Sequence, residues 1–358
     1  MYDVEIIGPD FGPGLWPPCN LEGISYQAVP SQNYIQYLYS AQKLIFASKA
    51  QIIYAIKPLI TSYGLALLIR LHYKTPVILD IDDWELGMAK WRLRQSKTAI
   101  VDILKAYWVG WTFFLERKIK RADKITVSGS FLQGRYGGVI IPHGRDTTYL
   151  NPTNFDSEKL RSTHRFKNEK ILLFLGTPRP HKGIEDLIKA VQLIPNKDIK
   201  ILLVGANHQD EYTQQLLSLN EPRLIVIPMR PLSEAPNWLT IADIVVIPQR
   251  ASLIAKGQTP AKLYDAMSMA KPIISTDVAD IPSILENCGF IVPPDDIQAL
   301  ADKISYVLQN PKTGHQMGLN ARQKCIKQYS WKIMQKKLIN IFEPYNQKTV
   351  SKNTVGTV

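Results

Sequence analysis

Cysteine is scarce in this sequence. The three cysteines, Cys19, Cys288 and Cys325, lie far apart, and no two of them form a C-x-x-C pair. Their spacing excludes a disulfide framework and a zinc site built on paired cysteines. Such cysteine usage is typical of a reducing compartment, so we expect a cytoplasmic protein.

Long apolar runs are also missing. The longest, AYWVGWTFFL (106–115), is too short to span a bilayer and lies between charged residues. The first residues, MYDVEIIGPDFG, lack the basic start and the apolar stretch of a signal peptide. We therefore expect no membrane-spanning helix and no signal peptide.

Acidic residues are fewer than basic ones. The chain has 31 Asp and Glu against 43 Lys and Arg, which gives a net charge of +12. Such an excess favours anionic partners, namely phosphorylated substrates, acidic lipid surfaces or nucleic acid. No nucleic-acid recognition motif accompanies the charge, so we expect no nucleic-acid partner. No G-x-G-x-x-G follows a strand, which argues against a dehydrogenase.

The 358 residues exceed one ordinary core and fit two domains. Short β-branched apolar runs alternate with helical patterns, which predicts parallel sheets with crossover helices. The predicted strands cover residues 4–8, 51–56, 76–81, 124–128, 138–142, 170–176, 199–205, 223–228, 243–248 and 272–277. The predicted helices cover residues 33–48, 62–73, 97–121, 184–194, 210–219, 234–242, 259–270 and 296–310.

A polar, turn-rich stretch, NPTNFDSEK, marks the expected domain boundary. We expect a first domain over 1–150, a second over 151–330, a helix over 331–345 and a frayed tail over 346–358. The predicted fold is α/β, with two Rossmann-like domains that face each other across a cleft. Ligands of open α/β sheets bind at the carboxyl ends of the strands, so the cleft would collect loops from both domains.

The stretch LGTPRPHKGIEDLIKA (175–190) joins a strand to a helix through a basic loop. Gly176 ends the strand, Arg179, His181 and Lys182 follow, and Gly183 opens the helix. Cations and free backbone N–H groups at a helix start suit a phosphate. The alternative is a basic surface loop that caps a helix.

A second stretch, GQTPAKLYDAM (257–267), carries charges in the first turns of a helix. Pro260 suits the first turn and Thr259 is a credible N-cap, so the N–H groups after them offer a second anion contact. Asp265, farther along, could accept two hydrogen bonds from a ribose diol. The alternative is that the helix dipole favours Asp265 and that Lys262 is its neighbour on the same face.

A third stretch, VILDIDDWE (77–85), ends a buried strand in carboxylates, which invites a metal or a general-base interpretation. Strand alternation places Asp80 and Asp82 on one side and Asp83 on the other. Asp83 as the cap of the next helix is the alternative, and a magnesium site would also need substrate phosphates. Lys57 and His143 follow other strands, and Lys57 could meet an anion.

The segment 97–121 has apolar residues at a helical period and basic residues at both ends. This pattern is typical of a helix that lies in a membrane interface. The alternative is a helix that packs on the first sheet and has basic ends.

Taken in order and spacing, these stretches resemble the family 4 glycosyltransferases, retaining enzymes of the GT-B type, over nearly the whole chain. The matching runs are LGTPRPHKGIEDLIKA, ILLVG, PNWLTIADIVVIP and GQTPAKLYDAMSMAKPIISTD. The resemblance implies a nucleoside-diphosphate-sugar donor, bound mainly by the second domain, with no metal and no further cofactor. It also implies transfer with retention of the anomeric configuration.

The resemblance implies roles for individual residues. Lys182 would contact the donor diphosphate, and Asp265, the second acid of the family's E-x7-E pattern, would bind the ribose. The further donor-binding residues would be Gly176, Arg179, Gln258, Thr259 and Pro260. Two positions depart from the family: Thr177 stands where members often carry an arginine, and Gly257 stands in place of the first acid, which contacts the transferred sugar.

Acceptors would bind the first domain, where Asp82 and Asp83 are candidates for contact with the acceptor hydroxyl. Together with Lys182 they form the expected catalytic set, in which Lys182 and helix N–H groups stabilise the departing diphosphate. The acceptor would be a glycan, a lipid-linked molecule or a small molecule. An anionic membrane surface, at the inner face of the cytoplasmic membrane, is a further expected partner.

The chain starts at what looks like the family's second strand, so one strand–helix unit with a glycine-rich turn is expected to be missing. Two alternatives to a transferase stay open, and the missing unit supports the second of them. One is a sugar-nucleotide epimerase on the same fold, and the other is a truncated, non-catalytic remnant that binds nucleotide.

Overall fold

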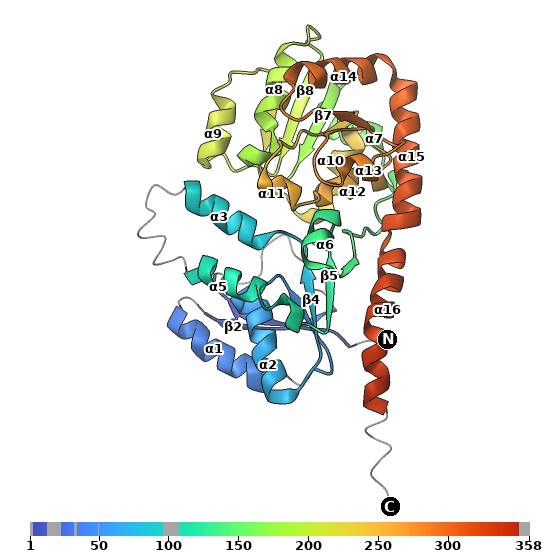
Figure 1. Cartoon of the computed structure of the whole chain (residues 1–358). Helices are drawn as coiled ribbons and strands as arrows, with labels where there is room; N and C mark the ends of the chain where they lie inside the picture. Colours follow the sequence, from blue (N-terminus) through green and yellow to red (C-terminus); the bar gives the residue numbers. More distant parts are fainter. Residues whose placement is uncertain (1–2, 13–22, 32–33, 49, 96–106, 351–358) are drawn as a thin grey trace, which may run out of the picture. The chain divides into compact units, whose positions relative to one another are not determined.

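The computed structural model describes residues 3–12, 23–31, 34–48, 50–95 and 107–350. The chain forms two compact units (Figure 1). The first comprises residues 1–141 and 336–358, and the second comprises residues 142–335. Each unit is built on parallel strands, as the alternation of apolar runs and helical patterns predicts.

The second unit contains a six-stranded parallel sheet in the order β12-β11-β10-β7-β8-β9. Its strands are β7 (Lys170–Leu175), β8 (Ile199–Val204), β9 (Leu224–Ile227), β10 (Ile244–Ile247), β11 (Ile273–Thr276) and β12 (Phe290–Val292). The strand order reverses between β7 and β10, which is the Rossmann arrangement. A ligand site is therefore expected at the carboxyl ends of these two strands.

The core of this unit lies on both faces of the sheet. Ile171 and Leu173 of β7 point into one cluster, and Leu172 and Phe174 point into the other. The first face is covered by α10 (Ala235–Ile241), α12 (Ala261–Ser268), α13 (Ile281–Ile284) and α15 (Pro311–Tyr329). The second is covered by α8 (Ile184–Gln192), α9 (Glu211–Leu217) and α14 (Ile297–Gln309), as Figure 1 shows. Because both faces are buried, the strands are continuous apolar runs.

Short helices complete the second unit. They are η3 (Pro152–Asn154), α7 (Ser157–Thr163), η4 (Pro180–Lys182), η5 (Leu232–Glu234) and α11 (Leu253–Lys256).

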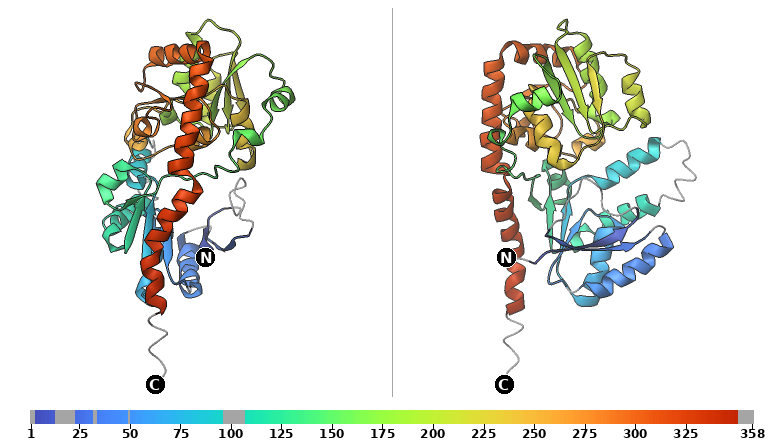
Figure 2. Two further views of the ribbon diagram at one scale, coloured as in Figure 1. Left: turned by 90° about the vertical axis from the view of Figure 1, so that its right-hand side faces the viewer. Right: turned by 180° about the vertical axis from the view of Figure 1, so that it is seen from behind.

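The first unit contains a four-stranded parallel sheet and a separate parallel strand pair. The sheet has the order β3 (Ile53–Ile56), β4 (Val77–Ile81), β5 (Lys124–Val127) and β6 (Val139–Ile140). The pair is β1 (Glu5–Asp10) with β2 (Ser25–Pro30), and α1 (Tyr34–Ala47) packs against both (Figure 2). The further helices are η1 (Ile60–Gly64), α2 (Leu65–Tyr73), α3 (Glu85–Gln95), α5 (Tyr107–Glu116), η2 (Ile119–Arg121) and α6 (Ser130–Tyr136).

The last helix, α16 (Trp331–Val350), belongs to the first unit from Lys336 onward. The ring centres of Phe342 and Tyr54 are 5.7 Å apart, and Lys337 Nζ donates to the Ile140 carbonyl at 3.5 Å. The helix continues to Val350, five residues beyond the expected end at residue 345. Residues 351–358 lie outside the described part.

Every predicted strand is present, but the units divide between Ile141 and Pro142, not at the expected boundary after residue 150. The reason is a set of contacts within the second unit. The backbone N–H of Arg145 donates to Tyr329 at 2.9 Å, and the N–H of Trp331 donates back to Arg145 at 2.7 Å. These bonds join the segment after β6 to the junction of α15 and α16.

Of the predicted helix 97–121, the structure describes α5 and η2, whereas 97–106 lie outside the described residues. Leu115 of α5 is buried in the core, and Trp111, Phe113 and Phe114 are exposed. The helix therefore packs on its sheet and also presents aromatic side chains outward. No helix within the described residues is long and apolar enough to cross a membrane.

Candidate functional site

The loop after β7 is held against the end of β10 by a glycine. Gly183 has φ +68°, and a Cβ there would lie 1.8 Å from the Pro248 carbonyl oxygen. No other residue fits this approach without movement of the backbone. The N–H of Arg250 donates to the His181 carbonyl at 3.0 Å, so the two loops at the reversal of strand order form one structure.

Arg250 also binds the first turn of α8. Its Nε and Nη2 donate to the two oxygens of Asp186 at 2.7 and 2.6 Å, and Nη2 reaches Glu185 at 2.7 Å. Such a bidentate pair fixes geometry as well as charge. The sequence shows Arg250 only as a loop residue after a strand, so its role in positioning the basic loop was missed.

Two lysine amines lie at the end of β7. Lys182 Nζ donates to the Thr177 carbonyl at 2.6 Å, which folds its side chain back over the loop. Lys262 Nζ, from α12, lies 3.7 Å from the centre of the Phe174 ring. A Cβ at Gly176 would be 3.2 Å from the same Nζ. Side chains from the loop after β7 and from α12 thus lie near the turn at Gly176.

The Lys262 amine is closed from solvent and has no hydrogen-bond or ion-pair partner among the described residues. Burial holds the pKa of Lys262 well below its ordinary value, the charge of Lys182 lowers it further, and Asp265 opposes this shift. Lys262 is thus a neighbour of Asp265 on α12 that makes no ion pair with it among the described residues.

The partner of Asp265 is Arg145. Its Nε donates to Oδ1 of Asp265 and its Nη2 to Oδ2 at 3.3 Å, while Nη2 also reaches the Ala261 carbonyl at 2.7 Å. The sequence places Arg145 after a strand in the HGRD run but does not show that it meets a helix 120 residues later. An ionised carboxylate accepts more than two hydrogen bonds, so the ribose role of Asp265 stays a prediction.

The start of α12 has no side-chain cap. Pro260 occupies the N-cap position, and Thr259, expected to cap, is buried and does not do so. Ser252 instead caps the preceding short helix α11, where its Oγ accepts from the Ala255 N–H at 3.1 Å. The N–H of Gln258 donates to the Ala255 carbonyl at 3.3 Å. The N–H of Leu263 donates to the Pro260 carbonyl at 3.0 Å. The N–H groups of Ala261 and Lys262, before it, are the ones that a helix start leaves for another acceptor.

Arg179 lies at the surface of the second unit. Its side chain is half exposed, and its Nη1 lies 3.4 Å from Oδ1 of Asp210. His143 packs beside Tyr264, with ring centres 6.3 Å apart. The role of Arg179 in donor binding stays a prediction.

In the first unit, Lys57 forms ion pairs with three carboxylates of the VILDIDDWE stretch. Lys57 Nζ lies 2.7 Å from Asp83, 2.7 Å from Glu85 and 3.4 Å from Asp82. Burial opposes the charge of Lys57, but Asp83, Glu85 and Asp82 outweigh it and raise its pKa. The anions that Lys57 meets are thus these three carboxylates. Asp82 and Asp83 converge, against the expected alternation, because β4 ends at Ile81.

Asp80 stays within β4 and is separate from this cluster. Thr126 of β5 donates to its Oδ1 at 2.5 Å, and Tyr54 is 3.1 Å from the Thr126 hydroxyl. Burial raises the pKa of Asp80. These contacts link β4 to β5 and to β3, so Asp80 has a structural role. Among the described residues, no group of three or more His, Cys, Asp or Glu is arranged to hold a metal ion.

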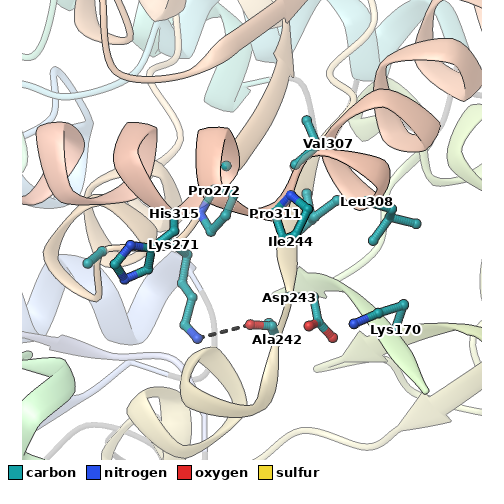
Figure 3. Close-up of a pocket in the computed structure, with 12 residues that line it drawn as sticks. Lys170, Ala242, Asp243, Ile244, Lys271, Pro272, Val307, Leu308, Pro311 and His315 are labelled. Carbon is teal, nitrogen blue, oxygen red and sulfur yellow. Dashed lines mark hydrogen bonds between the residues drawn. The ribbon is translucent and has the colours of Figure 1, made fainter. Parts of the chain in front are cut away.

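A pocket of about 230 Å³ lies at the amino ends of the strands of the second unit's sheet, away from the turn at Gly176 (Figure 3). It is lined at the amino ends of strands by Lys170, Asp243 and Lys271, and by His315 of α15. Lys271 Nζ donates to the carbonyls of Thr240 and Ala242 at 2.8 and 2.9 Å, and burial lowers its pKa to about 8. Asp243 accepts from the Ile171 N–H at 2.8 Å. Lys271 and Asp243 thus bind backbone groups near the amino ends of the strands, which is a structural role. The candidate ligand site is therefore the other end of the sheet, at Gly176.

Comparison with known proteins shows which proteins this part of the chain is similar to. Residues 156–324 match the family model of glycosyl transferases group 1. The MMP alpha-(1->4)-mannosyltransferase of Mycolicibacterium hassiacum is 24% identical over 210 residues, which are 57% of this chain and 47% of that protein. The chain spans about half the length of the curated relatives it matches.

Solved structures extend the likeness to nearly the whole chain. HepE from Anabaena, in complex with UDP and glucose, has a TM-score of 0.75 at 18% identity and covers 94% of this chain and 91% of its own. Sucrose-phosphate synthase from Thermosynechococcus elongatus has a TM-score of 0.73 at 18% identity, with 98% and 90% covered. By these findings the chain has the GT-B fold and is similar, over residues 156–324, to the glycosyl transferases group 1.

Proposed function

We propose that the chain is a glycosyltransferase that moves a sugar from a nucleoside-diphosphate sugar to an acceptor hydroxyl, with retention of configuration. The observation that carries the proposal is the cationic site at the carboxyl ends of β7 and β10, where Lys182 and Lys262 meet the turn at Gly176. The family match spans this whole site, which lies within residues 156–324.

The donor diphosphate would bind at Gly176, Lys182 and the uncapped start of α12, after Gln258, Thr259 and Pro260. The ribose would bind Asp265, whose carboxylate Arg145 holds in place. When the bond from the sugar to the diphosphate oxygen breaks, the oxygen gains charge. A fixed ammonium and aligned N–H groups stabilise that charge without reorganisation. We propose that no metal is required.

The acceptor would bind the first unit, where Lys57 holds Asp82 and Asp83 within one cluster. A carboxylate there can accept a hydrogen bond from the acceptor hydroxyl and orient it. The acceptor oxygen gains the bond to the anomeric carbon that the diphosphate oxygen loses, and the hydroxyl proton passes to the departing diphosphate. The acceptor is a glycan, a lipid-linked molecule or a small molecule, and a cell-envelope polysaccharide would fit this class.

We also propose that the protein acts in the cytoplasm, at the inner face of the membrane. The two cysteines within the described residues, Cys288 and Cys325, are buried free thiols, which suits a reducing compartment. The exposed aromatic side chains of α5 and the net charge of +12 support an anionic lipid surface as partner.

Calorimetric titration with UDP, GDP and ADP tests donor binding. We expect one of the three to bind and Lys182→Met to weaken it about 10- to 100-fold, since a charge-assisted hydrogen bond is lost. Lys189→Met, an exposed lysine of α8, is the matched control and should bind as the wild type does. Failure of the wild-type protein to bind any of the three would contradict the proposal.

Product analysis separates the transferase from its alternatives. With a nucleotide sugar and an acceptor, we expect a new glycoside whose anomeric configuration, read by NMR, matches that of the donor. An epimerised nucleotide sugar, formed without acceptor, would favour the epimerase. Binding of nucleotide without turnover of any donor sugar would favour the non-catalytic remnant.

A further inference from the structure

The pocket at the amino ends of the second unit's strands contains polar side chains that the fold does not use. Lys170, the first residue of β7, has an amine that makes no hydrogen bond or ion pair with any other described residue. The imidazole of His315 in α15 is likewise without a hydrogen-bond partner in the part of the chain that the structure describes. Figure 3 shows these two side chains at opposite ends of the pocket. Unlike Lys271 and Asp243, which bind backbone groups, they are available to a ligand.

The charged groups around the pocket leave an excess of positive charge. Asp243 accepts from the Ile171 N–H at 2.8 Å, and its Oδ2 lies 3.3 Å from Nη1 of Arg161, so these two opposite charges balance. Lys271 donates to two carbonyls, which carry no net charge. Burial lowers the pKa of Lys271 to about 8, so the ammonium is its main form at pH values below neutrality. Neither Lys170 nor Lys271 forms an ion pair with a described carboxylate.

The remaining wall of the pocket is apolar, and the pocket is small. Figure 3 shows the side chains of Pro272, Val307 and Leu308 on one side and the amines of Lys170 and Lys271 on the other. The volume is about 230 Å³, less than the roughly 300 Å³ at which pockets for drug-sized ligands begin. A nucleotide sugar is therefore too large for this pocket, whereas an anion with few carbon atoms fits.

We propose that the pocket is a second ligand site, for a small organic anion that has a carboxylate and a short apolar body. The amine of Lys170 binds the carboxylate, and the ammonium of Lys271 attracts it from the same side of the pocket. The apolar body lies against Val307 and Leu308, which removes apolar surface from water. This inference is independent of the proposed function, because the donor of that reaction binds at the opposite end of the strands.

Titration of the full chain with short carboxylates, followed by NMR of the backbone amides at about pH 6.5, where lysine amines are charged, tests the site and locates it. We expect hexanoate to shift the amide signals of Lys170 and His315, at the two ends of the pocket. Affinity should rise from acetate to butyrate to hexanoate, about three- to fourfold for each methylene that is buried. Hexanamide has the same apolar body without the charge and should bind about 3- to 10-fold more weakly than hexanoate.

Two variants separate the charge from the apolar wall. Lys170→Met removes the amine and keeps an unbranched side chain, so it should weaken hexanoate binding about 3- to 10-fold and leave hexanamide binding unchanged. Leu308→Ala should reduce the gain for each methylene and leave acetate binding unchanged. Lys197→Met is the matched control and should bind as the wild type does. Lys197 is exposed just before β8, at the same end of the sheet, and does not line the pocket.

Each opposite result would overturn the inference. Hexanoate that shifts no amide around the pocket would show that the pocket does not bind it. Equal binding of hexanoate and hexanamide would mean that no cation binds the carboxylate. An affinity that does not grow with chain length, or equal effects of Lys170→Met and Lys197→Met, would indicate unspecific attraction of anions to a basic protein. UDP, GDP and ADP, added to the same samples, should shift the amide of Gly176 and not that of Lys170, and their failure to bind would contradict the proposed function alone.

Discussion

At the scale of single residues, the sequence predicts where charge is needed but not which charges meet. Lys182 follows β7, and Asp265 lies in α12, the second helix after β10, so both follow the two strands at which the strand order reverses. Helical spacing, however, suggests a pair between Lys262 and Asp265. The observed partner, Arg145, lies 120 residues away, and no local rule can reveal such a contact.

The pair of Arg145 and Asp265 should be coupled energetically. Both are largely buried, and removal of one leaves the other charge without its partner. We expect Arg145→Met and Asp265→Asn each to lower the free energy of unfolding. The double variant should lose less than the sum, with a coupling energy of about 1–3 kcal/mol. Urea unfolding of the four proteins measures this, and simple additivity would show that the contact contributes nothing.

At the scale of elements, the predicted strands are the continuous apolar runs. The three-residue strand β12, FIV, was missed although it is apolar, and two other missed elements lack an apolar run. Strand β2, SYQAVP, is largely exposed and has no apolar run. Helix α15 buries Gly314, Gly318, Ala321 and Cys325, which are small and do not stand out in a hydrophobic pattern. The helix packs closely against the end of α12 because these side chains are small, not because they are strongly hydrophobic. The periodicity of hydrophobic residues therefore does not predict α15.

Gly318 tests this explanation of α15. Alanine favours a helix over glycine by about 1 kcal/mol, so propensity alone predicts that Gly318→Ala stabilises the protein. A Cβ at this position, however, would lie 2.1 Å from the Ala270 carbonyl oxygen. We expect the backbone to shift and the free energy of unfolding to fall by about 2–4 kcal/mol, measured by urea unfolding.

The control for this prediction is Gly134→Ala in α6. A Cβ at Gly134 would meet nothing within 4 Å, so the substitution should be neutral or stabilise the protein by up to about 1 kcal/mol. An equal response of the two glycines would contradict the packing argument, because only Gly318 has a backbone oxygen in its way.

At the scale of the whole molecule, the two α/β units and their parallel sheets were predictable, because alternating apolar runs and helices allow few other folds. The sequence did not predict where one unit ends and the other begins. The segment after β6 reads as the end of the first domain, yet backbone hydrogen bonds of Arg145 place it in the second unit. The exposed aromatic surface of α5 in the first unit, by contrast, agrees with the interfacial pattern of the segment 97–121.

That surface carries the last prediction. Trp111, Phe113 and Phe114 of α5 are exposed, and Arg117 and Lys118 lie over the two phenylalanine rings at 4.2 and 5.4 Å from the ring centres. Exposed aromatic side chains next to basic groups suit the boundary of headgroups and acyl chains in an anionic membrane. Each basic side chain contributes about 1 kcal/mol near such a surface, and salt weakens this contribution.

Liposome flotation distinguishes electrostatic from apolar binding on this surface. We expect the protein to float with vesicles that contain anionic lipid, less so as salt increases, and not with neutral vesicles.

Arg117→Gln with Lys118→Gln should weaken flotation by about tenfold or more, because two attractive charges are lost and each tenfold change is 1.4 kcal/mol. Phe113→Ala with Phe114→Ala should weaken it at every salt concentration, because apolar burial is not screened. Lys189→Gln is the control, because it removes one positive charge from α8 of the second unit, outside this surface. An effect of Lys189→Gln equal to half that of the double variant would mean that only net charge matters, and α5 would then have no special role.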